Sequence, residues 1–395
     1  MFHHPQNHPQ IIAASSFARR LALFYSAIFV AVGIQLPFFP LWLEAKGVDT
    51  RAIGFILAAP MVVRVFAIPV ATRQADRRRA LRATIVATSV AAAVGIVAVG
   101  FAEGSMTILI VFGLVSFAYT PIMPLADAYA LRGLTQYGRA YGPVRLWGSA
   151  AFIAGSLGTG CIIDSIAPGN VIWLIAAAMI ATAGAASALA PLNPGTPAPA
   201  GPEPSHKELL RTPGFIAVAI AAGLIQASHA VYYGFSTLDW RAAGLDGSTV
   251  GALWALGVVA EITLFAISGR LPAALGPAGL LLLGAIGATL RWTVMVLDPP
   301  AFALPFLQCL HGLSFGATHL GAIGFLARAA PPGLAATAQG YLAIALGTVM
   351  AVAMGLSGVL YGAFGGLAYA AMAVMAVAGG LFALAAQRTA RATPV

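Results

Sequence analysis

Charge is scarce in this sequence. Only 8% of its 395 residues are Asp, Glu, Lys or Arg, whereas about a quarter of an average soluble domain is charged. Hydrophobic residues make up 60% of the chain. Water is an unsuitable solvent for this composition, so the sequence predicts a protein that lies in a lipid bilayer.

Cysteine is scarce too, and the sequence motifs of catalysis are absent. Cys161 and Cys309 both lie in apolar stretches and indicate nothing about disulfides or redox compartment. No zinc-ligand, nucleophile-elbow or phosphate-loop spacing occurs, and the three histidines of MFHHPQNHPQ lack metal-ligand spacing. We therefore expect no enzyme, no metal and no cofactor. A membrane sensor is disfavoured as well, because we find no signalling domain or large polar insert.

Long apolar runs are what the sequence does have. Runs of about 20 residues are long enough to cross roughly 30 Å of hydrocarbon as a helix. Twelve such runs predict an all-α polytopic membrane protein with twelve transmembrane helices. They cover residues 20–43, 52–72, 80–101, 106–131, 141–163, 169–190, 213–238, 249–269, 277–297, 300–327, 336–361 and 366–386.

The stretch PLNPGTPAPAGPEPSHKELLRTP divides these helices into two groups of six. It is too polar and too rich in proline to cross a membrane, and its composition is typical of an extended linker. We accordingly expect an N-terminal tail at 1–18, a six-helix bundle at 19–190, a linker at 191–212, a second bundle at 213–387 and a C-terminal tail at 388–395.

The two bundles carry an internal repeat. KGVDTRAIG at 46–54 returns as AGLDGSTVG at 243–251, in the loop between the first and second helix of each bundle. Because each half keeps the same order of helices, the repeat is parallel and related by an axis along the membrane normal. The register pairs Gly47 with Gly244, Asp49 with Asp246, Gly54 with Gly251, Arg64 with Glu261 and Arg73 with Arg270.

Basic residues predict the orientation, since they are retained on the cytoplasmic side of membrane proteins. Only Lys46, Arg51 and Arg241 fall in the opposite set of loops. Both tails and the linker are therefore expected in the cytoplasm, at the inner membrane, and the formal charge of +9 indicates topology rather than nucleic-acid binding. The cytoplasmic set comprises Arg19, Arg20, Arg73, Arg77, Arg78, Arg79, Arg82, Arg132, Arg139, Lys207, Arg211, Arg270, Arg328, Arg388 and Arg391.

Five charged residues lie inside the apolar runs: Arg64, Asp127, Arg145, Glu261 and Arg291. Each costs at least about 2.5–3.5 kcal/mol there, so each needs a partner, a cavity or a function. Arg64 and Glu261 lie about 12 residues into their helices, roughly 18 Å deep. Carriers place their sites at this depth, although a structural charge network is the alternative. Asp127 and Arg145 lie nearer the cytoplasmic ends, where a structural pair and a cavity pair remain equally open.

Two predicted helices also have a mixed polar and aromatic face. Aromatic faces suit a ring, and arginine binds a carboxylate through two hydrogen bonds, so the pattern indicates an amphipathic anion; histidines satisfied by packing are the alternative. A charged Glu261 is costly inside an apolar run, so this residue tends to take up a proton and is the candidate proton carrier. The faces consist of Gln226, His229, Tyr233 and Ser236 on the seventh helix, and Gln308, His311, Phe315 and His319 on the tenth, with Trp254 before Glu261 on the eighth.

Two stretches resemble the major facilitator superfamily. In TRQADRRRA, between the second and third helices, Ala75, Asp76 and Arg77 match the superfamily signature, while Thr72 and Arg79 replace its usual glycines. YGPVRLWGSAAFIAG at 141–155 resembles the fifth helix of the proton symporters that include the lactose, nucleoside and phenylpropionate permeases. The resemblance implies a cytoplasmic gating loop at Asp76 and Arg77.

The proton-symporter resemblance also implies a substrate role for an acid on the fourth helix and an arginine on the fifth, here Asp127 and Arg145. Residues 226–262, RW at 291 and LQCLH at 307 resemble the bacterial 3-phenylpropionate permeases of that group. This resemblance implies the uptake of a small aromatic carboxylate together with protons. The glycine- and proline-rich motif of drug exporters is missing from GSLGTGCIID.

The sequence thus predicts a proton symporter that works by alternating access. A carrier for nucleosides, sugars or drugs is the alternative. The expected partners are a small organic anion, protons and the bilayer, and the protein is expected to function as a monomer. We assign proton coupling to Glu261, His319 and Asp127, and substrate binding to Arg64, Arg145, His229, Tyr233, Trp254, Arg291 and His311.

Overall fold

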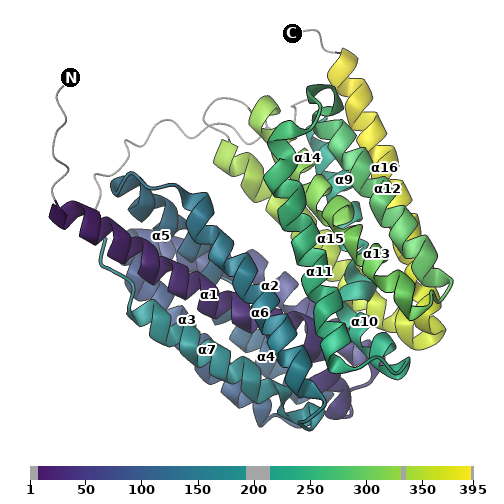
Figure 1. Cartoon of the computed structure of the whole chain (residues 1–395), viewed down its shortest axis with the longest axis horizontal. Helices are drawn as coiled ribbons and strands as arrows, with labels where there is room; N and C mark the ends of the chain where they lie inside the picture. The colour runs from purple at the N-terminus through teal and green to yellow at the C-terminus, as the bar shows by residue number, and fades with distance from the viewer. Residues whose placement is uncertain (1–7, 193–213, 331–334, 393–395) are drawn as a thin grey trace. The chain divides into compact units, whose positions relative to one another are not determined.

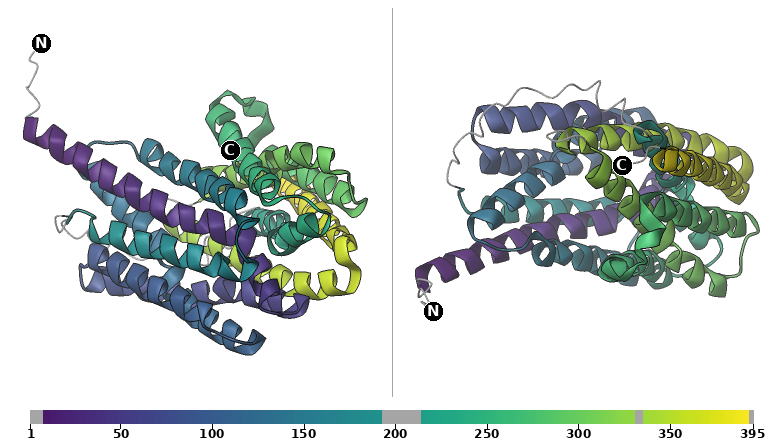
Figure 2. Two further views of the ribbon diagram at one scale, coloured as in Figure 1. Left: turned by 60° about the horizontal axis from the view of Figure 1, so that its bottom comes forward. Right: turned by 90° about the horizontal axis from the view of Figure 1, so that it is seen from above.

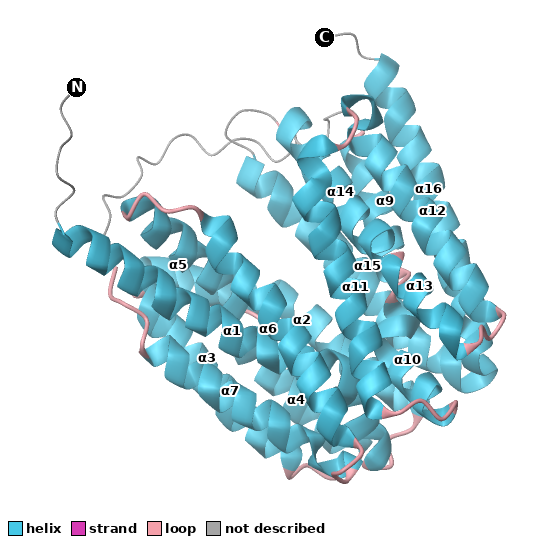
Figure 3. Cartoon of the chain, viewed as in Figure 1, coloured by secondary structure: helices cyan, strands magenta, loops and turns pink. Residues whose placement is uncertain are grey.

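The structure is a computed structural model that describes residues 8–192, 214–330 and 335–392 (Figure 1). Every regular element in these ranges is a helix, as Figure 3 shows. The predicted linker lies almost wholly outside the described residues. The all-helical fold class predicted from the apolar runs is confirmed.

The helices of the N-terminal half follow the predicted runs. The fourth run is divided into two helices, and α1 begins at His8, so part of the predicted N-terminal tail is helical. The helices are α1 (His8–Ala45), α2 (Thr50–Arg77), α3 (Leu81–Gly100), α4 (Ser105–Tyr119), α5 (Ile122–Gln136), α6 (Tyr141–Ile163) and α7 (Val171–Ser187), with a 3-10 turn at Pro168–Asn170.

The helices of the C-terminal half are more irregular. Two of its predicted runs are interrupted, one of them by a π-helical turn at Gly312–Ala317. The α-helices are α9 (Phe215–Ala227), α10 (Ala230–Ala242), α11 (Gly247–Ile267), α12 (Gly276–Val296), α13 (Leu304–Cys309), α14 (Thr318–Ala329), α15 (Ala335–Phe364) and α16 (Tyr369–Ala392).

Eleven helical stretches of the described residues are long and apolar enough to cross a membrane. The last of them, Thr337–Arg388, is 52 residues long, about 78 Å of helix and more than twice the hydrocarbon thickness. It contains α15 and α16, which are joined by a 3-10 turn at Gly365–Ala368, where Gly365 has a positive φ of 55°. This stretch therefore provides two crossings, so each of the twelve predicted helices has a counterpart.

Large apolar side chains remain exposed along these helices. Val70 and Leu114 are both 66% exposed, and Val374 is 69% exposed. In water such a surface would be a large hydrophobic liability, whereas lipid solvates it at no cost. The chain is accordingly a multi-pass membrane protein.

Contacts divide the chain into two compact units. The first takes in the described residues up to Gly47 and those from Val63 to the linker, and the second joins Val48–Val62 to the C-terminal half. The division thus falls within α2, whose first half packs in the C-terminal unit rather than in the bundle predicted to contain it. Glycines allow this, since a Cβ on Gly54 would lie only 2.9 Å from the Cα of Gly358 on α15.

Small residues also bring α1 and α6 together inside the N-terminal unit. A Cβ on Gly33 would lie 2.4 Å from the Phe152 carbonyl oxygen, and one on Gly155 would lie 2.8 Å from the Val30 carbonyl oxygen. Figures 1 and 2 show the two helices side by side. Close backbone contact of this kind is how membrane helices gain packing energy without a hydrophobic driving force.

The internal repeat is visible in the turn before the second helix of each half. Gly47 and Gly244 have φ of 73° and 85°, the left-handed backbone that glycine favours after a helix. The Asp49 carboxylate then accepts from the Ala52 N–H at 3.0 Å, and the Asp246 carboxylate accepts from the Thr249 N–H at 2.7 Å. Both aspartates cap their helices by the same contact, as the repeated sequence requires.

Three of the predicted membrane helices are broken. The α4–α5 break lies at Thr120 and Pro121, as the proline predicts. The α9–α10 break lies at Ser228 and His229, without a proline. The third is the π-helical turn between α13 and α14. The last two breaks face the most polar part of the C-terminal unit.

Candidate functional site

A buried arginine lies at the centre of the C-terminal unit. Arg291 of α12 is fully buried. Its Nη2 donates to Gln308 Oε1 at 2.6 Å, and its Nη1 donates to His311 Nδ1 at 3.1 Å. Its Nε has no hydrogen-bond partner in the described part of the chain. A buried donor without a partner is rare in proteins and marks a position where a ligand or water oxygen can bind.

His311 lies between Arg291 and Glu261. Because Arg291 can only donate, Nδ1 of His311 must accept, and its proton is therefore on Nε2. That Nε2 is 3.9 Å from Glu261 Oε2, beyond hydrogen-bond distance but close enough for electrostatic coupling. Three groups thus follow one another across the unit: the Arg291 guanidinium on α12, the His311 imidazole just after α13, and the Glu261 carboxyl group on α11.

Aromatic rings surround the Arg291 guanidinium. Its Cζ is 4.3 Å from the ring centre of Tyr232 and 4.6 Å from that of Trp292, which are cation–π distances. Tyr232 stacks on Trp254 with ring centres 4.6 Å apart, and its hydroxyl donates to Gln308 Oε1 at 3.0 Å. The rings hold the guanidinium in one orientation and form an apolar wall beside it.

His229 is positioned by the α9–α10 break. Its Nδ1 lies 3.2 Å and 3.0 Å from the carbonyl oxygens of Ile225 and Gln226, so Nδ1 carries the proton. Nε2 then accepts from the Ser314 hydroxyl at 2.9 Å. Since carbonyls in the last turn of a helix lack intrahelical partners, the break supplies the acceptors that orient this ring.

A second cluster lies in the N-terminal unit, around Asp127 of α5. Asp127 Oδ1 accepts from the hydroxyls of Tyr25 at 2.6 Å and Tyr141 at 2.8 Å. The Arg145 guanidinium lies over the rings of Phe29 and Tyr25, 4.2 Å and 5.6 Å from their centres. Tyr25 is therefore shared by the predicted acid and the predicted arginine.

The structure groups most of the predicted site residues but not all. It brings together Glu261, His229, Tyr233, Trp254, Arg291 and His311 in the C-terminal unit, and Asp127 and Arg145 in the N-terminal unit.

Four predicted residues remain: His319, Arg64, Asp76 and Arg77. The exposed His319 stacks on Phe315 with ring centres 6.4 Å apart, and Phe315 stacks on His311 with ring centres 5.3 Å apart, so His319 borders the C-terminal cluster. Arg64 is half-buried on α2, in the N-terminal unit. Asp76 and Arg77 are exposed at the end of α2.

Several contacts were not predicted from the sequence. The hydroxyls of Ser314 and Tyr25 each contact a predicted site residue, and the Tyr232 hydroxyl contacts Gln308 of the predicted polar face. Tyr141 was detectable, because it precedes Arg145 by one helical turn. By the same criterion Tyr232 was also detectable, because it follows His229 by three residues.

Comparison with known proteins identifies the family. A model of the MFS_1 like family matches residues 18–375. The chain belongs to this family. The probable 3-phenylpropionic acid transporter of Escherichia coli (strain K12) is 33% identical over 373 residues, covering 91% of this chain and 95% of that protein. The maltose permease of Geobacillus stearothermophilus is 29% identical over 321 residues, 80% of each chain.

Solved structures agree on the fold. The nucleoside transporter NupG superposes with a TM-score of 0.79 at 15% identity, covering 94% of this chain and 98% of that one. A D-xylose–proton symporter gives a TM-score of 0.69 at 12% identity, with 94% and 97% covered. This MFS_1 like protein is therefore a membrane transporter of a small molecule and not an enzyme.

Proposed function

We propose that this transporter takes up a small aromatic carboxylate, similar to 3-phenylpropionate, together with protons, by alternating access. The observation that carries the proposal is the buried series Arg291, His311 and Glu261 beside stacked aromatic rings. The similarity to the probable 3-phenylpropionic acid transporter of Escherichia coli supports the substrate class.

Arg291 is our candidate for the carboxylate-binding residue. A guanidinium binds a carboxylate through two parallel hydrogen bonds, and its current partners, Gln308 and His311, are neutral groups that a carboxylate would displace with a gain in electrostatic energy. The phenyl ring would then lie against Tyr232, Tyr233 and Trp254, whose ring centres are 4.6–6.1 Å from one another and of which Trp254 stacks on both tyrosines. Stacked rings of this kind favour a flat apolar group.

Charge balance gives a reason for proton coupling. In the empty site, Arg291 and Glu261 carry opposite charges that cancel. A bound carboxylate leaves one uncompensated negative charge, which costs at least about 2.5–3.5 kcal/mol in the membrane interior. Protonation of Glu261 restores neutrality, so we propose one proton for each carboxylate, with His311 between the two groups as the relay.

Asp127 and Arg145 are our second candidate pair. Both contact Tyr25, so a ligand that displaces the Tyr25 hydroxyl would affect the two groups together. We assign Asp127 to proton coupling and Arg145 to substrate binding, in keeping with the resemblance of residues 141–155 to proton symporters. His319 remains a candidate for proton transfer and Arg64 for substrate binding, and Asp76 and Arg77 for gating at the cytoplasmic loop.

A sugar or nucleoside carrier is the second candidate function. The 29% identity to the maltose permease favours it, and stacked tyrosine and tryptophan rings also suit a sugar or a nucleobase. A neutral substrate adds no charge to the pair of Arg291 and Glu261, which already cancel. The charge argument would then no longer require a proton at Glu261.

The test is the external pH of lightly buffered, de-energised cells that express the protein. Addition of 3-phenylpropionate should make the medium alkaline, because each carboxylate enters with a proton. Radiolabelled 3-phenylpropionate, uridine and maltose, supplied in parallel, report which substrate class enters. Glu261→Gln should abolish the pH change and uphill accumulation while leaving exchange of substrate.

Glu103→Gln is the matched control. Glu103 is an exposed carboxylate that pairs with Lys46 at 3.2 Å in a loop region, so this change removes the same charge without touching the cluster. Full accumulation by Glu261→Gln would contradict the coupling role, and entry of uridine or maltose without 3-phenylpropionate would favour the second function.

A further inference from the structure

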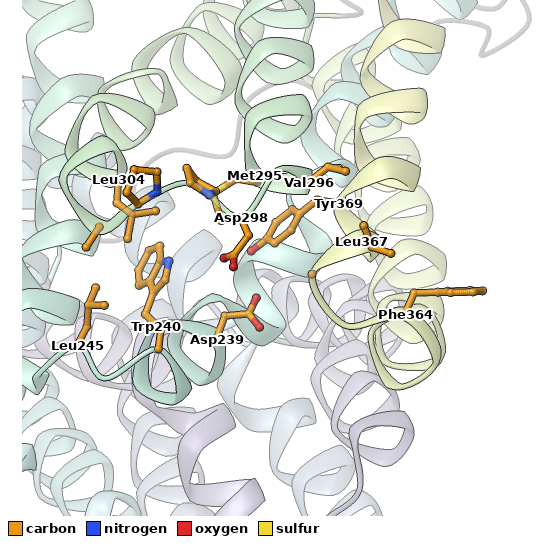
Figure 4. A pocket seen from close by; sticks show the side chains of 15 residues that line it. Asp239, Trp240, Leu245, Met295, Val296, Asp298, Leu304, Phe364, Leu367 and Tyr369 are labelled. Atoms are coloured by element: carbon orange, nitrogen blue, oxygen red, sulfur yellow. The ribbon is translucent and has the colours of Figure 1, made fainter.

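A separate pocket of about 600 Å³ opens at one end of the C-terminal unit. It lies where α10 leads into α11, α12 into α13, and α15 into α16, and Figure 4 shows its side chains. By the predicted orientation, this is the outer face of the membrane. Its size is in the range of small-molecule sites.

The charges of this pocket are both negative. Asp239 and Asp298 line it, and Figure 4 shows their carboxylates directed to the same space. Asp239 accepts from the Tyr361 hydroxyl. No lysine, arginine or histidine is among the lining residues that the structure describes, and the neighbouring Arg241 donates to the Leu245 carbonyl oxygen at 3.1 Å. Two carboxylates so placed repel each other and favour a cation between them.

Two buried polar groups in the same pocket have no partner. Trp240 is 3% exposed and Tyr369 is 1% exposed, and neither the indole Nε1 of Trp240 nor the Tyr369 hydroxyl has a hydrogen-bond partner among the described residues. In Figure 4 both groups point toward the space in front of Asp298. Buried donors of this kind are normally satisfied, so a ligand that fits must also bring an acceptor.

We propose that this pocket binds a small organic ammonium ion that also carries a hydroxyl or carbonyl oxygen. The ammonium group would bind between Asp239 and Asp298, and the oxygen would accept from Trp240 or Tyr369. Met295 and Leu304 provide an apolar wall for the rest of the molecule. The rings of Trp240 and Tyr369 add faces that attract a cation.

The proposed ammonium site selects a positive ligand, whereas the cluster of Arg291, His311 and Glu261, here called the transport cluster, selects a negative one. Tyr369 stacks on Trp292, with ring centres 5.7 Å apart, and Trp292 in turn lies against Arg291. The Arg291 cluster therefore begins behind the pocket wall and would repel a cation. Binding of an ammonium ion consequently reports on the outer pocket, and binding of 3-phenylpropionate in the same sample reports on the transport cluster.

Calorimetric titration of the purified protein in lipid nanodiscs tests this proposal. The probe is 2-amino-3-phenylpropan-1-ol, a cation at neutral pH, and its comparator is 3-phenylpropan-1-ol, which has the same ring and hydroxyl but no charge. We expect the amine to bind at least about tenfold more tightly. Asp298→Asn should remove most of that preference, and Trp240→Phe should weaken both ligands about threefold.

Glu103→Gln serves again as the control, since it removes an exposed carboxylate outside the pocket and should leave both affinities unchanged. Asp298 is exposed, so we expect its replacement by asparagine to be compatible with folding, and a size-exclusion profile of the variant checks this. Equal affinity for the amine and the alcohol would overturn the proposal. A preference for the amine that persists in both Asp298→Asn and Asp239→Asn would also overturn it.

Discussion

The contact between α2 and α15 gives a prediction that can be worked out from distances. A Cβ on Gly358 would lie 2.3 Å from the Thr50 carbonyl oxygen and 3.0 Å from the Gly54 Cα. Ordinary contact begins near 3.4 Å, so the two backbones must separate by about 1 Å to admit a methyl group. Overpacking of this kind costs about 1–3 kcal/mol, because backbone cannot rotate away as a side chain can.

Gly358→Ala should therefore destabilise the protein relative to Gly355→Ala. Gly355 lies one turn earlier on α15, where a Cβ would meet only the Phe55 ring at an ordinary 3.5 Å. Both changes gain the helix propensity of alanine, about 1 kcal/mol. That gain cancels between the two variants, which leaves the overpacking cost of about 1–3 kcal/mol as the difference.

Reversible unfolding in mixed detergent micelles, followed by circular dichroism, measures this difference. Gly355→Ala should be as stable as the parent or slightly more stable, and Gly358→Ala clearly less stable than Gly355→Ala. Transport should follow the same order, since the first half of α2 is held to the C-terminal unit through this contact. Equal stability of the two variants would refute the close approach of α2 to α15.

Two further predictions concern loops outside the membrane. Arg79 has a φ of 50°, at the position where the superfamily signature that this loop resembles has glycine. Arg79→Gly should therefore raise the free energy of unfolding by about 0.5–1 kcal/mol. A free energy of unfolding below that of the parent protein would show that this backbone is unstrained. The hydrogen bond from the Thr249 N–H lowers the pKa of Asp246. The cap therefore stabilises the folded protein fully at a pH above the unfolded-state pKa of Asp246, and this stabilisation is lost as the pH falls through its folded-state pKa. Asp246→Asn should remove that dependence, which thermal unfolding between pH 3 and 7 would detect.

The fold was predictable because its main determinant, the length of an apolar run, can be read from a short stretch of sequence. Apolar runs of sufficient length must cross the bilayer as helices, and the twelve predicted runs depend on nothing else. The repeated turn was also readable, since glycine and aspartate have narrow roles at Gly47, Asp49, Gly244 and Asp246. The assignment of residues 48–62 to the C-terminal unit was not predictable, because a single glycine such as Gly54 does not specify which helix approaches it.

The candidate cluster was predictable only in part. Charge within an apolar run marked Arg291 and Glu261, and this signal is independent of helix geometry. The faces drawn from regular spacing were partly informative, since His229 stacks on Tyr233 and His311 stacks on Phe315 as the spacing predicts. They did not indicate contacts between helices, such as those of Tyr232 with Arg291 and Gln308.

The α9–α10 break and the π-helical turn explain how so many polar groups are satisfied in an apolar unit. An unbroken helix commits its backbone carbonyls to the N–H groups four residues on, whereas at the break after α9 the carbonyls of Ile225 and Gln226 also contact the His229 ring. The Phe315 carbonyl of the π-helical turn similarly accepts from Gln226 at 3.4 Å. Backbone carbonyls at the irregular turns thus orient the His229 ring and the Gln226 side-chain amide. A carrier that must bind a charged substrate without water gains from such irregular helices, because they supply polar contacts at fixed positions without adding further charge.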